Sequence, residues 1–205
     1  MRRFAGAALA VAAVAFGAQG QVPGVEFAAP GSSFSGDNGP WTLGWSFRVN
    51  NAPINVTHLG YYDHDGNGLG QSHDVGLWDI NGNLLASLTV PAGTAAPLTG
   101  HFRYVQLSSA VVLAANQSYV IGGVSGGQGG NDFYTFNTTG FTVIPEITFT
   151  GDRWVGGNIL TFPTQISGVA NGFFGANFMH GEIPAPGALA LLGVAGVVSR
   201  RRRRA

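Results

Sequence analysis

The amino-acid sequence predicts an all-β fold, an antiparallel two-sheet sandwich of the jelly-roll or immunoglobulin-like kind. Three observations support this prediction. The chain contains 33 glycines among 205 residues, and glycine is a residue that tight turns often require. Segments that alternate apolar and polar side chains recur at intervals of about eight to twelve residues, as they do in sandwich proteins. Between the two chain ends, no segment has the apolar period of about 3.6 residues that is typical of a surface helix.

The clearest strand is Trp41–Val49, where apolar residues alternate with small or polar ones. Its large aromatic side chains fall on one face, and this leaves two interpretations open. Burial between two sheets would make them part of a core. Exposure would make them a platform on which sugar rings stack. The exposure of Trp41, Trp45 and Trp78 therefore separates a structural module from a carbohydrate-binding one.

The other strands follow in order along the chain. Ile54–Tyr62 predicts a second strand, whose apolar pattern slips register around His58 as at a bulge. Residues 75–80 and 83–90 predict two strands that the Asn81-Gly82 dipeptide joins as a hairpin. Loops are expected at residues 63–72 and 91–100. Further strands are predicted at residues 101–107, 117–124, Phe133–Phe136, 141–149 and 172–179.

The N-terminal residues 1–20 have the features of a signal peptide. Arg2 and Arg3 supply a positive start, an apolar run follows, and Ala18-Gln19-Gly20 supplies the small residues of a cleavage site. The run has no polar face, which argues against an N-terminal helix packed on the domain. We therefore predict export and a mature chain that begins near Gln21. Residues 21–182 then form one exported domain, for which their length is suitable.

The C-terminal residues 183–205 predict a transmembrane helix followed by a charged stop. An uncharged apolar run extends from residue 183 to residue 199. As a helix it would be about 26 Å long, near the lower limit for crossing a bilayer. The arginines that follow would stay on the cytoplasmic side and hold the preceding chain outside. These membrane-stop residues are Arg200, Arg201, Arg202, Arg203 and Arg204.

The order of the parts at this end resembles the PEP-CTERM protein-sorting signal, a segment also called the ice-binding protein C-terminal domain. The parts are the tripeptide Pro184, Ala185 and Pro186, the apolar span and the arginine tail. The resemblance implies delivery to the bacterial envelope, outer surface or extracellular matrix. It also implies an exosortase-type processing enzyme as a partner, and the membrane as a partner before processing. Ala185 departs from the family pattern, which has Glu at this place, and a single-span anchor without a sorting enzyme is the alternative.

A second resemblance covers residues 40–125. Its motifs are similar to a β-sandwich module of unknown function, of the DUF4082 kind, which is common among surface proteins with this C-terminal signal. The resemblance implies a β-sandwich ectodomain and brings no catalytic residue with it. It is carried by Leu59-Gly60-Tyr61-Tyr62-Asp63, Ser72-His73-Asp74-Val75-Gly76-Leu77-Trp78-Asp79, Leu84-Leu85-Ala86 and Phe102-Arg103-Tyr104.

The charge distribution argues against nucleic acid as a partner. Seven of the ten arginines lie in the two end segments, and the chain has no lysine. The exported part keeps Arg48, Arg103 and Arg153 against ten acidic residues, a formal charge of −7. Phosphate contacts need basic side chains, whereas an acidic body is compatible with divalent cations. Because the chain has no cysteine, disulfides and thiolate metal sites are excluded.

The stretch from residue 63 to residue 74 has the spacing of a calcium loop, with hard oxygen ligands on alternate residues. The last ligand is Asp, a shorter arm than the usual Glu, and no helix flanks the loop. Clusters of Asp, Asn and Gly are also what connecting turns prefer. Two interpretations therefore remain open. One is a calcium site, which would make calcium the one cofactor that the sequence indicates. The other is a plain connecting loop. The ligands of the calcium interpretation are Asp63, Asp65, Asn67, the Leu69 carbonyl and Asp74.

Catalysis has little support in the sequence. The histidines lack the spacing of a transition-metal site, so we expect them to be surface residues or hydrogen-bonded loop residues. Carboxylate pairs could flank a glycosidic bond, but no nucleophile motif accompanies them. The histidines are His58, His64, His73 and His101, and the pairs are Asp74 with Asp79 and Asp132 with Asp152.

We therefore predict no catalytic residue and no enzyme. The expected function is a non-catalytic structural or binding module at the cell surface or in the extracellular matrix. The alternative class is a secreted carbohydrate-binding or carbohydrate-active protein, with a polysaccharide as its partner. An exposed aromatic row beside paired acids would favour this alternative, and aromatic residues inside a sandwich would favour the structural module.

Overall fold

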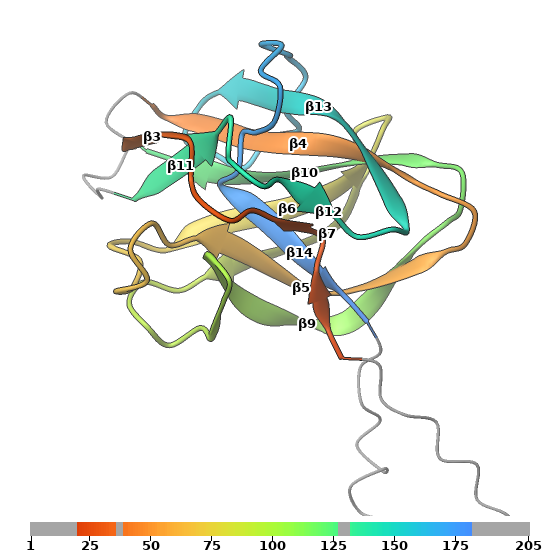
Figure 1. Cartoon of the computed structure of the whole chain (residues 1–205), viewed down its shortest axis with the longest axis horizontal. Helices are drawn as coiled ribbons and strands as arrows, with labels where there is room; N and C mark the ends of the chain where they lie inside the picture. The colour runs from red at the N-terminus through yellow and green to blue at the C-terminus, as the bar shows by residue number, and fades with distance from the viewer. Residues whose placement is uncertain (1–19, 36–38, 127–131, 182–205) are drawn as a thin grey trace, which may run out of the picture.

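The structure is a computed structural model that describes residues 20–35, 39–126 and 132–181 (Figure 1). These residues form antiparallel β-strands and contain no helix, which confirms the all-β prediction. In these ranges, accordingly, no helix has the length and apolarity needed to cross a membrane. Residues 1–19 of the predicted signal peptide lie outside the described residues. The predicted sorting signal and transmembrane span, residues 183–205, also lie outside them.

Two five-stranded sheets make up most of the domain. Sheet I has the order β1-β14-β5-β9-β8, and sheet II has the order β13-β4-β10-β6-β7. The strands of sheet I are β1 (Val22–Pro23), β14 (Ala176–His180), β5 (Ile54–Tyr62), β9 (Phe102–Leu113) and β8 (Leu98–Thr99). The strands of sheet II are β13 (Ile147–Gly156), β4 (Trp41–Val49), β10 (Ser118–Ser125), β6 (His73–Asp79) and β7 (Leu84–Val90). Two small sheets pair β11 (Phe133–Phe136) with β3 (Ser32–Ser35) and β12 (Thr142–Val143) with β2 (Val25–Glu26).

Side chains from both large sheets form one apolar core. The aromatic residues predicted on β4 point into this core, and Trp45 and Phe47 are fully buried. The indole of Trp45 stacks on Phe178 of β14, with ring centroids 5.7 Å apart. Its Nε1–H donates to the carbonyl oxygen of Ala176 at 2.8 Å, so the polar group of this ring is satisfied inside the core. The interior interpretation of the β4 row is therefore confirmed.

The other two tryptophans whose exposure separates the structural interpretation from the carbohydrate-binding one also pack against aromatic rings. Trp78 on β6 is 4 % exposed, and the ring of Phe162 meets it edge-on with centroids 6.1 Å apart. Trp41 is half-buried and meets Tyr134 edge-on at 6.3 Å. These three rings do not form an open row for stacking.

Two local predictions agree with the structure in detail. Asn81-Gly82 forms the turn between β6 and β7, and Gly82 adopts the positive φ of 87° that favours glycine. The carboxylate of Asp79 accepts the N–H groups of Asn81 and Asn83, each at 2.9 Å. The Asn83 side chain also donates to this carboxylate, at 2.7 Å. This bond has the largest effect, and together with the backbone bonds it lowers the Asp79 pKa. The expected slip near His58 is a register shift on β5, between Val56 and His58.

Other elements differ from the prediction. The strand predicted at 141–149 is two strands, β12 and β13, separated by a turn in which Ile147 donates to the Ile144 carbonyl. Pro145 lies inside this turn, and proline has no N–H to give to a sheet. Strand β9 continues to Leu113, beyond the predicted end at residue 107. The segment before Pro40 contains β1, β2 and β3, where no strand was predicted.

The two ends of the described domain lie together at one edge of sheet I (Figure 1). Val22 on β1 pairs with His180 on β14. His180 in turn pairs with Val56 near the start of β5, whereas the loop at 63–72 follows the other end of β5. The two ends of the described domain and this loop therefore lie at opposite ends of strand β5.

Candidate functional site

The predicted calcium loop begins with a buried ion pair. Asp63 is 3 % exposed, and its Oδ2 accepts the Nε–H of Arg103 at 2.6 Å and the Gly68 N–H at 3.0 Å. Arg103 also donates to the carbonyl oxygens of Ala96 at 2.9 Å and Gly66 at 3.0 Å. A buried carboxylate needs such a partner because isolated burial of a charge is costly. Asp63 therefore serves to fix the loop on strand β9.

The other predicted ligands have separate partners. Asp65 accepts the side-chain N–H of Asn67 at 2.7 Å, and the Leu69 carbonyl accepts the Gly93 N–H at 2.7 Å. Asp74 lies on β6 and accepts the hydroxyl of Thr89 at 2.6 Å. Within the described ranges, no group of three or more His, Asp or Glu side chains could hold a metal ion. This arrangement fits a connecting loop better than a calcium site, and calcium binding stays a prediction.

A second buried pair joins His73 to Asp132. His73 is 1 % exposed, and its ring stacks on Tyr61 at 3.6 Å. Its Nε2 lies 2.9 Å from Asp132 Oδ2 and its Nδ1 lies 2.8 Å from the Val124 carbonyl oxygen. Each ring nitrogen therefore faces an oxygen of the protein itself.

Asp132 holds the end of the same loop. Its two carboxylate oxygens accept the backbone N–H groups of Gly70 at 2.8 Å and Gln71 at 2.9 Å. Burial acts to raise the Asp132 pKa, but the hydrogen bonds from His73 and from these two N–H groups outweigh burial, and the pKa is lowered. The His73–Asp132 pair therefore cross-links β6, the 63–72 loop and the segment before β11.

The carboxylate pairs considered for glycoside hydrolysis have structural partners instead. Asp79 closes the β6–β7 turn, and Asp74 bonds to Thr89. Asp152 is 1 % exposed and accepts the N–H groups of two consecutive residues, Ser167 at 2.6 Å and Gly168 at 2.9 Å. Together with the engagement of Asp132 by His73, these contacts give each carboxylate a hydrogen-bond partner within the domain.

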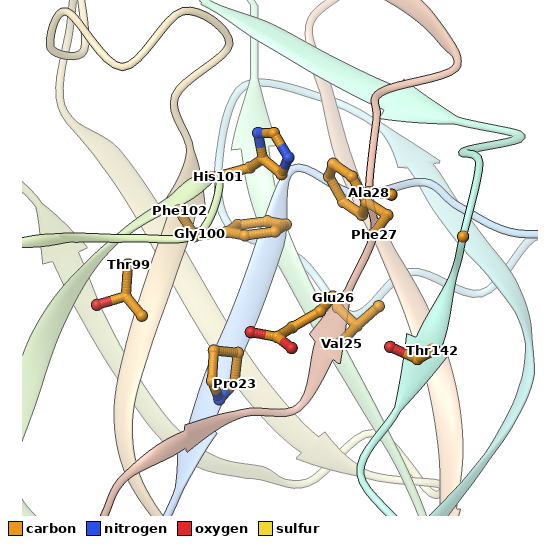
Figure 2. Close-up of a pocket in the computed structure, with 11 residues that line it drawn as sticks. Pro23, Val25, Glu26, Phe27, Ala28, Thr99, Gly100, His101, Phe102 and Thr142 are labelled. Carbon is orange, nitrogen blue, oxygen red and sulfur yellow. The ribbon is translucent and has the colours of Figure 1, made fainter.

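A pocket of about 310 Å³ lies between the N-terminal segment and the β8–β9 turn (Figure 2). The ring of Phe27 stacks on His101, with centroids 4.7 Å apart and planes 10° apart, and meets Phe102 edge-on at 5.8 Å. The described lining contains one carboxylate, Glu26, and no arginine. Other polar groups of the lining are the hydroxyls of Thr99 and Thr142. The sequence alone did not reveal this site because its residues come from three separate segments.

A buried asparagine holds the N-terminal wall of this pocket in place. Asn177 on β14 accepts the Val25 N–H at 3.2 Å and donates to the Val25 carbonyl oxygen at 2.8 Å. It also donates to the Tyr104 hydroxyl at 2.8 Å. Burial, followed by the nearby charge of Glu26, raises the Tyr104 pKa. Asn177 thus fixes the backbone of Val25, the residue that precedes Glu26.

Two more hollows adjoin this region. One of about 420 Å³ shares Pro23, Glu26 and Thr142 with the first and adds Glu146. The other, of about 650 Å³, shares Thr99 with the first and contains His58 and Tyr104 in its lining. Burial lowers the His58 pKa. Glu26 is therefore common to two neighbouring hollows.

The fold and these contacts define an all-β domain in which buried ion pairs fix loops. The sequence matches the family model described as "Domain of unknown function (DUF4082)" over residues 27–174. The match spans more than half of the chain, so the chain belongs to this family. It also extends beyond the region 40–125 on which the resemblance was based. No curated protein matches the sequence.

Proposed function

We propose that this protein is an exported bacterial cell-surface or extracellular-matrix protein whose domain is a non-catalytic structural or binding module. The observation that carries the proposal is the burial of the β4 aromatic row, in which Trp45 and Phe47 are fully enclosed. An exposed row would have supplied a long stacking surface for a polysaccharide. Its enclosure instead gives the domain a core that needs neither disulfides nor metal.

The finer architecture that we propose is a two-sheet jelly roll. The strand orders β1-β14-β5-β9 and β4-β10-β6-β7 support it. In chain order, β4, β5 and β6 alternate between the two sheets, and β6 and β7 form a hairpin. Strands β9, β10 and β14 then alternate between the two sheets again. This is the connectivity of two Greek keys wrapped into a sandwich. An immunoglobulin-like order would place hairpin neighbours together within a sheet more often.

The chemistry of the buried polar groups supports a non-catalytic role. Asp63, His73 and Asp132 each have hydrogen-bond partners within the protein. A general base needs a free nitrogen or oxygen within reach of a substrate proton. In this arrangement the hydrogen bonds of these groups instead hold loops of the protein itself, which supports a structural role.

Export and sorting rest on the two end segments. The proposed signal peptide, residues 1–20, and the proposed PEP-CTERM segment, residues 183–205, would attach to the same edge of sheet I, because Val22 pairs with His180. A domain attached there would direct the 63–72 loop away from its anchor. We propose an exosortase-type enzyme and the membrane as partners of the C-terminal segment. We propose no nucleic-acid partner because the exported part carries three arginines against ten acids.

Intact-mass measurement tests the sorting proposal. The full chain is expressed in a bacterium that has an exosortase and in a matched strain lacking it, and the mature product is recovered from the surface. We expect a product that begins near Gln21 and ends close to Pro184-Ala185-Pro186 in the first strain. A surface product that still carries Arg200 to Arg204 would reject processing and leave a simple anchor.

One observation favours carbohydrate binding as a second candidate. The pocket in Figure 2 combines aromatic rings, a carboxylate and two threonine hydroxyls, which are groups that saccharide sites use. Binding of the full chain to an array of bacterial polysaccharides tests it. Retention that is lost on substitution of pocket residues would support this candidate, and no retention would remove it.

A further inference from the structure

The carboxylate of Glu26 differs from the buried carboxylates of this domain. Asp63 and Asp132 form the two ion pairs found among the described residues, and Asp152 accepts two backbone N–H groups. No ion pair or side-chain hydrogen bond of Glu26 is found in the same part of the chain. Its backbone is nevertheless fixed, because it pairs with Thr142 across β2 and β12.

Glu26 is exposed, and its side chain borders a pocket whose lining includes aromatic rings. Figure 2 shows the Glu26 side chain extending toward Pro23, with the rings of Phe102 and His101 bordering the same pocket. The stacking of His101 on Phe27 holds the imidazole against the pocket wall. The pocket thus joins one negative charge to aromatic rings, and both a carboxylate and the negative face of an aromatic ring attract a cation.

The net charge of the whole domain also favours the binding of a cation. The exported part has a formal charge of −7, and one of its three arginines, Arg103, is buried in the ion pair with Asp63. The outer surface therefore presents even less positive charge than the composition indicates. A net negative field raises the local concentration of cations near an acidic pocket.

We propose that the pocket in Figure 2 binds an alkylammonium group, the shared feature of an amino sugar and a lysine side chain. The ammonium would pair with the Glu26 carboxylate, and its carbon atoms would pack on Phe102 and Pro23. The lining has no Asn, Gln or Arg side chain, so it offers few directional donors for a neutral sugar. This inference rests on the proposal that the domain is a binding module, but it does not depend on export or sorting.

Amide NMR titration of the full 205-residue chain in non-ionic detergent tests the proposal. The probes are glucosamine and Nα-acetyl-lysine amide, each compared with its N-acetylated, uncharged form. A pocket with one ion pair should bind with a dissociation constant of about 1 mM, so titration to about 30 mM covers the range. We expect shifts at Thr99, His101 and Thr142 with the charged probes, and affinity that falls as salt rises.

Glu26→Gln keeps the size of the side chain and removes its charge. It should weaken binding of the charged probes about tenfold or more, while Asp65→Asn, the same change at an exposed carboxylate in the 63–72 loop, should change it by less than about twofold. Unchanged amide spectra of both variants away from the substitution would show that they fold. Binding of glucosamine alone indicates an amino-sugar source, and binding of the lysine probe alone indicates a protein source.

Three results would overturn the inference. These are the absence of pocket shifts with either charged probe, equal binding of the uncharged forms, and binding that Glu26→Gln leaves intact. None of them touches the mass of the surface product, so failure here and failure of the sorting proposal are distinguishable.

Discussion

Replacing Arg103 with leucine removes the guanidinium that faces the buried carboxylate of Asp63. In the intact protein this group donates to Asp63 at 2.6 Å, to the Ala96 carbonyl at 2.9 Å and to the Gly66 carbonyl at 3.0 Å. In the variant, the carboxylate would keep the Gly68 N–H as its donor. Loss of one partner of a buried ion pair costs about 3–5 kcal/mol. We therefore expect a loss of stability of that size, and a fall in Tm of roughly 10 °C.

Thermal and urea denaturation measure this loss, and Arg48→Leu is the matched control. Arg48 is exposed and bonds to Asn116 at 3.3 Å, so its replacement should cost less than about 1 kcal/mol. The double variant of Arg103→Leu with Asp63→Leu should cost less than the sum of the single substitutions, because it leaves no buried charge unpaired. Equal melting of Arg103→Leu and Arg48→Leu would refute the reasoning.

Three more predictions follow from the core, the second ion pair and the loop. Trp45→Ala should lower stability by about 3–5 kcal/mol in denaturant melts, and an unchanged melt would place the ring at the surface. Asp132→Asn should cost about 2 kcal/mol near pH 7. The folded-state pKa of Asp132 is lowered from 3.8, so its carboxylate stabilises the fold above that pH, and the deficit of the variant should shrink as the pH falls through the lowered pKa. Melting in about 5 mM calcium and in chelator at matched ionic strength should give equal Tm values, whereas a calcium-dependent rise that Asp65→Ala abolishes would establish the calcium loop.

The strands that could be predicted are those whose signal is local. The alternation on β4 and the Asn81-Gly82 turn between β6 and β7 are visible within a few residues. Strands β1, β2 and β3 are two to four residues long, and their partners β14, β12 and β11 lie near the other end of the domain. Strand β13 has a register shift between Phe149 and Gly151, which interrupts the alternation that would have revealed its full length. Long-range pairing produced these strands, and composition could not show it.

The same limit applies to the buried polar groups. Asp63 and Arg103 are 40 residues apart, and His73 and Asp132 are 59 residues apart. Local spacing showed only that acidic residues recur in a glycine-rich stretch. The resemblance to the family did include Tyr61, Asp63, His73 and Arg103, which are now seen to be buried. The signal that could have revealed these pairs is the presence of polar residues inside family motifs that are otherwise apolar.

Arg103 places a fixed positive charge at the start of the 63–72 loop, against Asp63, the first ligand of the calcium interpretation. Its guanidinium contacts a carboxylate oxygen of Asp63 and the carbonyl oxygens of Gly66 and Ala96, which are oxygen groups of the type that calcium binds. A second cation would meet the repulsion of this fixed charge at short range. The end of the loop is held by a negative group instead, because the Asp132 carboxylate accepts two consecutive backbone N–H groups. The Arg103 guanidinium at one end and the Asp132 carboxylate at the other can therefore keep a loop rich in Gly and Asp in one conformation without calcium.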